Sequence, residues 1–140
     1  MGLFDIFKKK AAPKKEAEKS LPPEAMKWNK MWELWEKEQA KSPYQELMTY
    51  QSEINNGGHS QFFFNVSNTG NLDAVVKEVL SILPETLSGN LEDAFSAYKK
   101  YADVDDDKMD EILDNCDDIF YENEDDVNKI LEDYAETIEL

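Results

Sequence analysis

The sequence predicts an all-α protein, a compact bundle of about six helices. From residue 21 onward, apolar residues recur at spacings of three and four, which is typical of helices that bury one face. Proline, glycine and asparagine separate these segments, and none of them predicts a strand with confidence. With 140 residues, the chain is expected to form a single helical domain, residues 21–140, preceded by a basic, flexible tail, residues 1–20.

The tail combines a short apolar cluster with a lysine-rich spacer. Leu3, Phe4, Ile6 and Phe7 come first, and six lysines follow up to Lys19. Four apolar residues form little more than one helical turn, so we expect a frayed terminus. The alternative is a weak contact with a membrane surface through residues 3–19.

Two prolines begin the first expected helix. Pro22 and Pro23 suit a helix entry, and the helix is expected to run to about Ala40. Pro43 then interrupts the chain, and a second helix follows over residues 44–54. The sequence Asn55-Asn56-Gly57-Gly58 is expected to end that helix. The tryptophans of the first helix, expected in the core or at an interface, are Trp28, Trp32 and Trp35.

The middle of the chain contains one ambiguous run and two expected helices. Residues 61–65 fit a short strand or a buried helical turn, and the helical neighbours favour the turn. Asn71 is expected to cap a helix that reaches Leu83. Pro84 to Gly89 is expected to be a loop, with Asn90 capping the next helix.

The last two expected helices are apolar on one side and acidic on the other. The apolar positions of the first are Met109, Ile112, Leu113, Cys116, Ile119 and Phe120, and those of the second are Val127, Ile130, Leu131, Tyr134 and Ile138. Both sets repeat at three and four.

Nearly all of the net charge of −16 comes from these two helices. Residues 1–19 carry +3 and residues 20–100 carry −4, whereas residues 101–140 hold seventeen acids and two lysines, a net −15. The chain contains no arginine, which removes bidentate recognition of phosphate. Such a surface repels nucleic acid and attracts basic partners in a salt-dependent way.

The density of these carboxylates is close to that of DNA phosphates. On a helix, residues 105–119 span ~22 Å, which gives about one net negative charge per ~3 Å, against one phosphate per ~3.4 Å of a DNA strand. Two adjacent acidic helices are expected to present two rows of carboxylates. The alternative is an acidic surface that is merely solvated. The candidate partner-binding residues are Asp105, Asp106, Asp107, Asp110, Glu111, Asp114, Asp117, Asp118, Asp125, Asp126, Glu132, Asp133 and Glu136.

A second pattern lies in residues 53–65, EINNGGHSQFFFN. The glycines permit a tight reversal, the amides are expected to satisfy open backbone groups, and the three phenylalanines are expected to supply core area. A peptide- or ligand-binding notch formed by the amides is the alternative. The residues concerned are Glu53, Asn55, Asn56, Gly57, Gly58, Gln61, Phe63 and Asn65.

This segment resembles the E-[VI]-N-N-G-G-x-x-Q-[FY]-F-x-N pattern of a bacterial DNA-mimic protein family, and the resemblance extends over about residues 25–140. His59 departs from it, because the family usually has an aromatic residue there. The resemblance implies an all-helical, often dimeric domain without known catalysis. It also implies a basic DNA-binding protein, a repressor or a nucleoid-type protein, as the partner.

Little in the sequence indicates an enzyme. The single histidine, His59, is expected to be exposed, with Glu53 as a candidate partner, and Cys116 is expected to be a buried, inert thiol. Asp103-x-Asp105-x-Asp107 lacks the later glycine and glutamate of a calcium loop. We therefore expect no catalytic residue, cofactor or metal, and a cytoplasmic location because one cysteine cannot form an internal disulfide.

These patterns predict a non-enzymatic acidic binding protein, a DNA mimic that occupies the DNA-binding face of a basic protein without itself binding nucleic acid. One alternative is an immunity-like or other protein-interaction module that does not compete with DNA. A divalent-metal protein is a further alternative.

Overall fold

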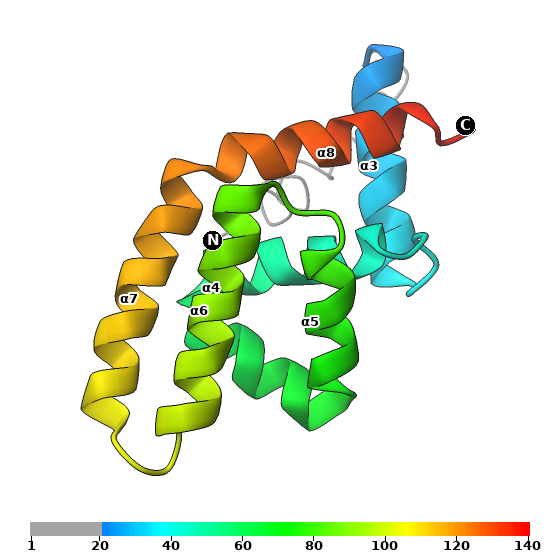
Figure 1. Ribbon diagram of the computed structural model, residues 1–140. Coiled ribbons are helices and arrows are strands. Elements are labelled where there is room, and N and C mark those ends of the chain that lie inside the picture. Colours follow the sequence, from blue (N-terminus) through cyan, green and yellow to red (C-terminus); the bar gives the residue numbers. More distant parts are fainter. Residues whose placement is uncertain (1–20) are drawn as a thin grey trace.

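The computed structural model describes residues 21–140, which confirm the all-α prediction: they form six helices and contain no strand (Figure 1). The expectations for the tail, including membrane contact, lie outside the described residues. The helices are α3 (Pro23–Glu36), α4 (Tyr44–Thr69), α5 (Leu72–Leu80), α6 (Glu85–Tyr101), α7 (Asp106–Glu122) and α8 (Glu124–Glu136).

The helices surround α4. Helices α6 and α7 form an antiparallel pair on one side of it, and α5 packs against α4 and α6 (Figure 1). Helix α8 follows α7 after Asn123 alone, turns away from the α7 axis, and crosses α3.

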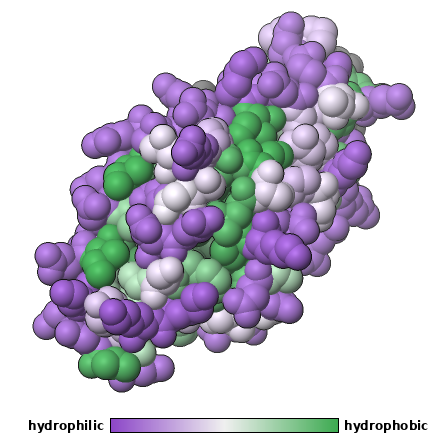
Figure 2. Space-filling model, viewed as in Figure 1, coloured by the Kyte–Doolittle hydropathy of each residue, from purple (hydrophilic) through white to green (hydrophobic). Residues whose placement is uncertain are grey.

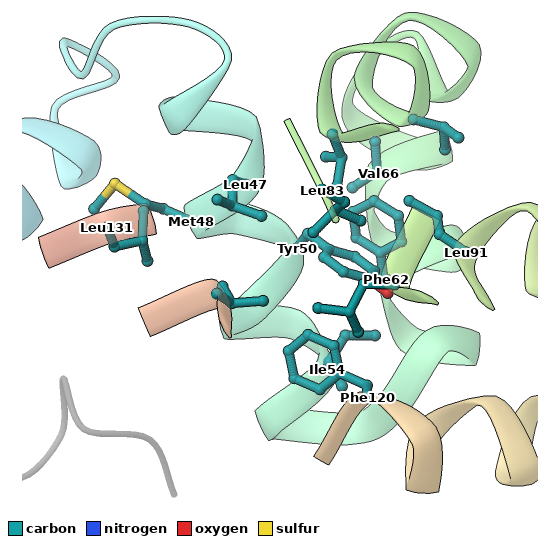
Figure 3. Packing of buried hydrophobic residues seen from close by; sticks show 14 of the residues in the cluster. Leu47, Met48, Tyr50, Ile54, Phe62, Val66, Leu83, Leu91, Phe120 and Leu131 are labelled. Carbon is teal, nitrogen blue, oxygen red and sulfur yellow. The ribbon is translucent and has the colours of Figure 1, made fainter. Parts of the chain in front are cut away.

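Aromatic residues of α4 form the centre of the core. Tyr50, Phe62 and Phe63 are fully buried, and Phe120 of α7 meets the Tyr50 ring edge-on (Figure 3). Burying one such side chain stabilises the fold by about 1.5–3 kcal/mol. Phe64 was expected in the core as well, but this prediction was wrong, because its side chain is 62% exposed.

Helix α3 ends at Glu36, four residues before the expected end. Glu38 has a positive φ of 57°, its N–H donates to Trp35 O, and Gln39 N–H donates to Leu34 O. This is the Schellman arrangement that closes a helix, here with glutamate in the left-handed position that glycine usually occupies. No glycine stands in the sequence at this helix end.

The expected loop from Pro84 to Gly89 is helical instead. Helix α6 begins at Glu85, directly after Pro84, and Leu87 within its first turn is fully buried. Asn90 is therefore not a cap, and lies buried inside the helix. Burial of Leu87 outweighs the weak helix propensities of serine and glycine.

The expected break after Ile54 is a kink within α4. Gly57 and Gly58 leave the helical conformation, and the helix resumes at His59 and continues through residues 61–65 to Thr69. The helical turn favoured for residues 61–65 is thus part of a longer helix. Asn71 caps α5 as expected, its side chain accepting from Ala74 N–H.

Candidate partner-binding surface

The acids of α7 occupy one side of the helix. At about 100° per residue, they fall within an arc of roughly 140°. The buried residues Leu113, Cys116 and Phe120 project from the opposite side. Hydrophilic side chains accordingly line the outer margin formed by α7 and α8 (Figure 2). The acids within the arc are Asp106, Asp107, Asp110, Glu111, Asp114, Asp117 and Asp118.

Helix α8 has the same division. Val127, Leu131 and Tyr134 are buried, and five acids fall within an arc of about 120° on the other side. These acids are Asp125, Asp126, Glu132, Asp133 and Glu136, and all five are exposed.

Helices α7 and α8 lie end to end and not side by side, so the expectation that two adjacent helices present two rows of carboxylates was wrong. Because α8 begins two residues after α7 ends and turns at Asn123, the two helices that carry the carboxylates follow one bent path (Figure 1). The 17 and 13 residues of α7 and α8 carry net charges of −7 and −5. Over ~45 Å of helix this is one net charge per ~3.8 Å, still close to the spacing of one DNA strand.

Most of these carboxylates have no counter-ion within the described chain. Among residues 21–140, the one ion pair that does not depend on a histidine proton is the exposed pair Lys129–Asp133, and Asp117 also contacts the His59 ring. Twelve of the thirteen acids predicted to bind a partner are exposed, and Asp117 is the exception. We call the twelve exposed acids the acidic face: Asp105, Asp106, Asp107, Asp110, Glu111, Asp114, Asp118, Asp125, Asp126, Glu132, Asp133 and Glu136.

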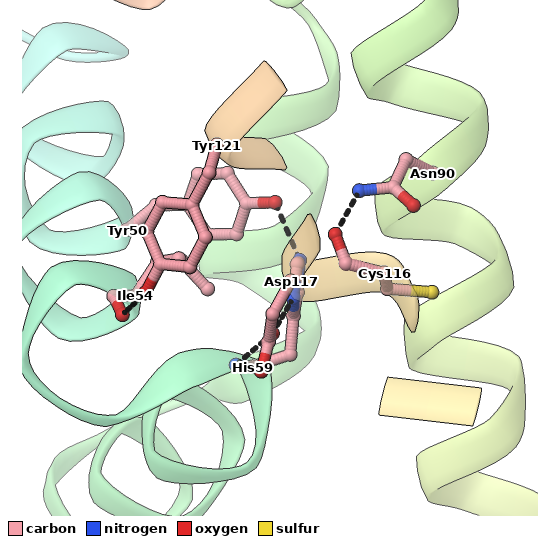
Figure 4. Close-up of polar contacts among 7 residues, drawn as sticks. All are labelled: Tyr50, Ile54, His59, Asn90, Cys116, Asp117 and Tyr121. Atoms are coloured by element: carbon pink, nitrogen blue, oxygen red, sulfur yellow. Dashed lines mark hydrogen bonds and ion pairs between the residues drawn. The ribbon is translucent and has the colours of Figure 1, made fainter. Parts of the chain in front are cut away.

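The carboxylate of Asp117 is directed toward α4 and forms hydrogen bonds there. Its Oδ1 accepts from the backbone N–H of His59 at 2.8 Å and from the His59 Nδ1–H at 2.6 Å, and its side chain is only 19% exposed (Figure 4). With the proton on Nδ1, the Nε2 atom of His59 accepts a hydrogen bond from the Tyr50 hydroxyl, at 2.6 Å. His59 is fully buried, so both its expected exposure and its expected pairing with Glu53 were wrong.

Gly58 brings His59 and Asp117 together. Its φ of 80° and ψ of −175° lie in a region that is essentially restricted to glycine. A Cβ at this position would also lie 2.9 Å from Asp117 Cγ. The kink turns the chain inward at His59, and the absent side chain leaves room for the carboxylate.

Burial keeps the neighbouring groups neutral. It raises the pKa of Tyr50 well above its usual value, with the nearby Cys116 and Asp117 adding to the effect. The pKa of Cys116 rises to about 11, mainly through burial and then through Asp93 and Asp117. Cys116 is buried, as expected. Both ring nitrogens of buried His59 have a hydrogen-bond partner. The series of hydrogen bonds from Tyr50 through His59 to Asp117 therefore joins α7 to α4.

Glu53 ties the two halves of α4 together across the kink. Its Oε2 accepts from Asn65 Nδ2 at 2.6 Å and from Gln61 Nε2 at 3.4 Å. These amides were expected to satisfy backbone groups, and this was wrong: they bind a side-chain carboxylate. The kink geometry is therefore held by side chains from both of its flanks.

The start of α8 is fixed to α4 in a similar way. Glu124 Oε2 accepts from Asn55 Nδ2 at 2.7 Å and from Gln51 Nε2 at 3.1 Å, and Gln51 also donates to Asn128. The bend between α7 and α8 thus rests on contacts with the first half of α4.

Two further contacts that the sequence did not reveal hold α7. Asn90 of α6 donates to the carbonyl of Cys116 at 2.8 Å, and the Tyr121 hydroxyl donates to the carbonyl of Ile54 at 2.8 Å (Figure 4). Asn90 follows a serine and a glycine, a context that also suits a cap, so its sequence carried no signal of this role.

In the part of the chain that the structure describes, no group of three or more histidine, cysteine or acidic side chains is arranged to hold a metal ion. Nor does any helix there have the length and apolar character required to cross a bilayer.

Comparison with known proteins assigns the fold to a family. Neither the curated proteins nor the solved structures gave a match. A protein-family model described as DMP19-like protein matches residues 40–138, from within the α3–α4 connection through α8. This is a family of DNA-mimic proteins, as the resemblance predicted, although α3 lies outside the match. Because the match covers well over half of its length, the chain belongs to the DMP19-like protein family.

Proposed function

We propose that the protein binds a basic DNA-binding protein through the acidic face and occupies the surface on which that partner holds DNA. The observation that carries this proposal is the set of exposed carboxylates on α7 and α8, most of which have no ion pair among residues 21–140. Membership of a DNA-mimic family supports it independently.

These carboxylates are held on a rigid support, which a mimic of a stiff polymer requires. Each acidic helix buries its apolar side in the core, and hydrogen bonds from α4 and α6 fasten both α7 and the start of α8. A partner therefore meets charges whose positions are already fixed, which lowers the entropic cost of binding.

The arrangement also has a cost within the free protein. Asp110–Asp114 and Asp114–Asp118 are like-charge pairs at i,i+4, and each destabilises the helix by about 0.2–0.5 kcal/mol. A surface that needed only to be soluble would gain from lysines interleaved at these positions. The retained repulsion is consistent with selection for a negative surface.

The test is a triple variant of α7, Asp110→Asn, Asp114→Asn and Asp118→Asn. Asp117 is left unchanged because it binds His59, and its loss would disturb the fold. We expect the triple variant to fold with unchanged or slightly higher stability, since four like-charge i,i+4 pairs are removed: Asp106–Asp110, Asp110–Asp114, Asp114–Asp118 and Asp118–Glu122. Its affinity for the partner should fall, with a weaker dependence on salt.

The matched control removes three exposed charges from elsewhere, with Glu33→Gln, Glu38→Gln and Asp73→Asn. It has the same net charge as the α7 variant, so the two differ only in where charge was removed. Partners are captured from native lysate at low salt, identified by mass spectrometry, and measured against both variants. Equal affinities for the two would refute a localised binding face.

A DNA-competition arm separates mimicry from other forms of protein binding. Duplex DNA should displace the captured protein if both use the same surface of the partner. A partner that remains bound in excess DNA would instead favour an immunity-like module.

A further inference from the structure

We propose that residues 1–19 bind the acidic face of their own chain, first along α8, and act as a built-in competitor for the basic partner. The competition rests on the proposed function, whereas the contact itself does not. The argument rests on where the described chain begins, on the charge of both surfaces, and on the length of the segment.

The described chain begins beside the end of α8. Helix α3 crosses α8, and its first turns lie next to the C-terminal end of α8 (Figure 1). Lys27 of α3 already donates from Nζ to the carbonyl of Glu136, at 3.2 Å. One lysine of the N-terminal region therefore contacts α8, and residues 1–19 are attached only a few residues earlier.

The two surfaces are complementary. Residues 1–19 contain six of the fifteen lysines of the chain, and five of these lie between positions 8 and 15. Two acids of α8, Glu132 and Glu136, are exposed and have no ionic partner within residues 21–140. Opposite charges attract over distances up to about the Debye length, which is ~10 Å at 0.1 M salt.

The segment is long enough to reach α7. Extended chain spans up to ~3.3 Å per residue, so Lys8 lies within ~45 Å of Pro22 along the chain. The axis of α8 measures only ~20 Å. Lysines 14 and 15 can therefore lie over α8, and lysines 8 to 10 can reach the near end of α7.

Tethering makes even a weak contact significant. A segment joined by a short flexible linker experiences an effective concentration on the order of millimolar. If an isolated lysine-rich peptide bound this surface with a Kd of roughly 0.1–1 mM, the attached segment would weaken an external basic ligand by about 2- to 10-fold.

Zero-length cross-linking of the purified full chain tests the contact without any partner. A carbodiimide joins a lysine amine to a carboxylate in direct contact, and mass spectrometry then locates the link. We expect links from Lys8, Lys9, Lys10, Lys14 and Lys15 to Glu132, Asp133 and Glu136, and their loss on raising NaCl from ~20 to ~500 mM. Mixing ¹⁴N- and ¹⁵N-labelled protein distinguishes links within one molecule from links between two.

The contact is refuted if these lysines form no links to α7 or α8, or only links between molecules. Co-sedimentation with phosphatidylglycerol vesicles provides the other arm. Vesicle binding through the lysines, together with absent internal links, would assign the segment to a membrane surface and overturn the proposal.

Competition is tested with a deca-lysine peptide as the probe. One variant changes Lys8, Lys9, Lys10, Lys14 and Lys15 to Gln, and the matched control changes Lys37, Lys41, Lys77, Lys99 and Lys100 to Gln. Both have the same net charge, but only the first lacks the competitor. Calorimetry should show at least about twofold tighter binding by the first. Equal affinities would refute the competition even if the contact is real, and a failed search for a natural partner would affect only the proposed function.

Discussion

The most informative single substitution is Gly58→Ala, because it changes the backbone that positions α7. Gly58 has a φ of 80° and a ψ of −175°, and an added Cβ would lie 2.9 Å from Asp117 Cγ. Alanine therefore meets both an unfavourable backbone conformation and a carboxylate that has to move.

The two effects can be given magnitudes. A residue held in such a sparsely populated conformation costs about 1–3 kcal/mol. Displacing Asp117 weakens its two bonds to His59, and a hydrogen bond to a charged group contributes about 1.5–3 kcal/mol. If part of one bond survives, we expect a loss of about 3–5 kcal/mol, which is a large fraction of the ~5–15 kcal/mol of a typical domain.

Urea unfolding followed by circular dichroism and tryptophan fluorescence measures this loss. Gly89→Ala is the control, because nothing lies within 4 Å of the Cβ it adds and Gly89 lies within α6. Alanine in a helix interior is more favourable than glycine by about 0.5–1 kcal/mol, so the control should be stabilised. A loss below ~1 kcal/mol in Gly58→Ala would refute the account of the kink, because the backbone term alone predicts more.

Three further outcomes follow from the buried contacts. Asn90→Ala should destabilise the fold by about 0.5–1.5 kcal/mol in the same urea assay, because the carbonyl of Cys116 loses the side-chain donor that joins α6 to α7; unchanged stability would count against this contact. His59→Phe should be destabilising although phenylalanine has a similar shape, since Asp117 and the Tyr50 hydroxyl lose the partner that they share. Unchanged stability would show that these hydrogen bonds do not contribute to stability. Finally, burial raises the pKa of Cys116 to about 11 and also raises that of Tyr50, so both groups ionise more readily in the unfolded chain. Stability should therefore fall as the pH rises from about 9 toward 11; rising stability over that range in urea titrations would contradict it.

Helices with strong amphipathic periodicity could be predicted from the sequence. Residues of α7 and α8 combine a three-four apolar repeat with acids on the other side, so local pattern and tertiary burial agree. The start of α6 could not be predicted, because serine and glycine locally favour a loop and only the burial of Leu87 decides for helix.

The polar contacts that hold the acidic face were outside the reach of sequence reasoning. The bond between His59 and Asp117 joins residues 58 positions apart, and nothing in the acidic run distinguishes Asp117 from its neighbours. The kink illustrates the same limit. The glycines indicated a break, whereas the packing of Phe62 and Phe63 determines that the chain resumes as a helix.

Because two buried-side carboxylates hold α7 and α8 in place, the exposed acids of these helices can change without altering the fold. Asp117 and Glu124 each accept two hydrogen bonds from α4 and set the path of α7 and α8, whereas the twelve acids of the acidic face have exposed side chains. Shape and charge are therefore specified by different residues. The exposed acids of α7 and α8 could therefore be replaced by lysines or neutral amides without changing the bend between the two helices, provided that positions 117 and 124 remain acidic.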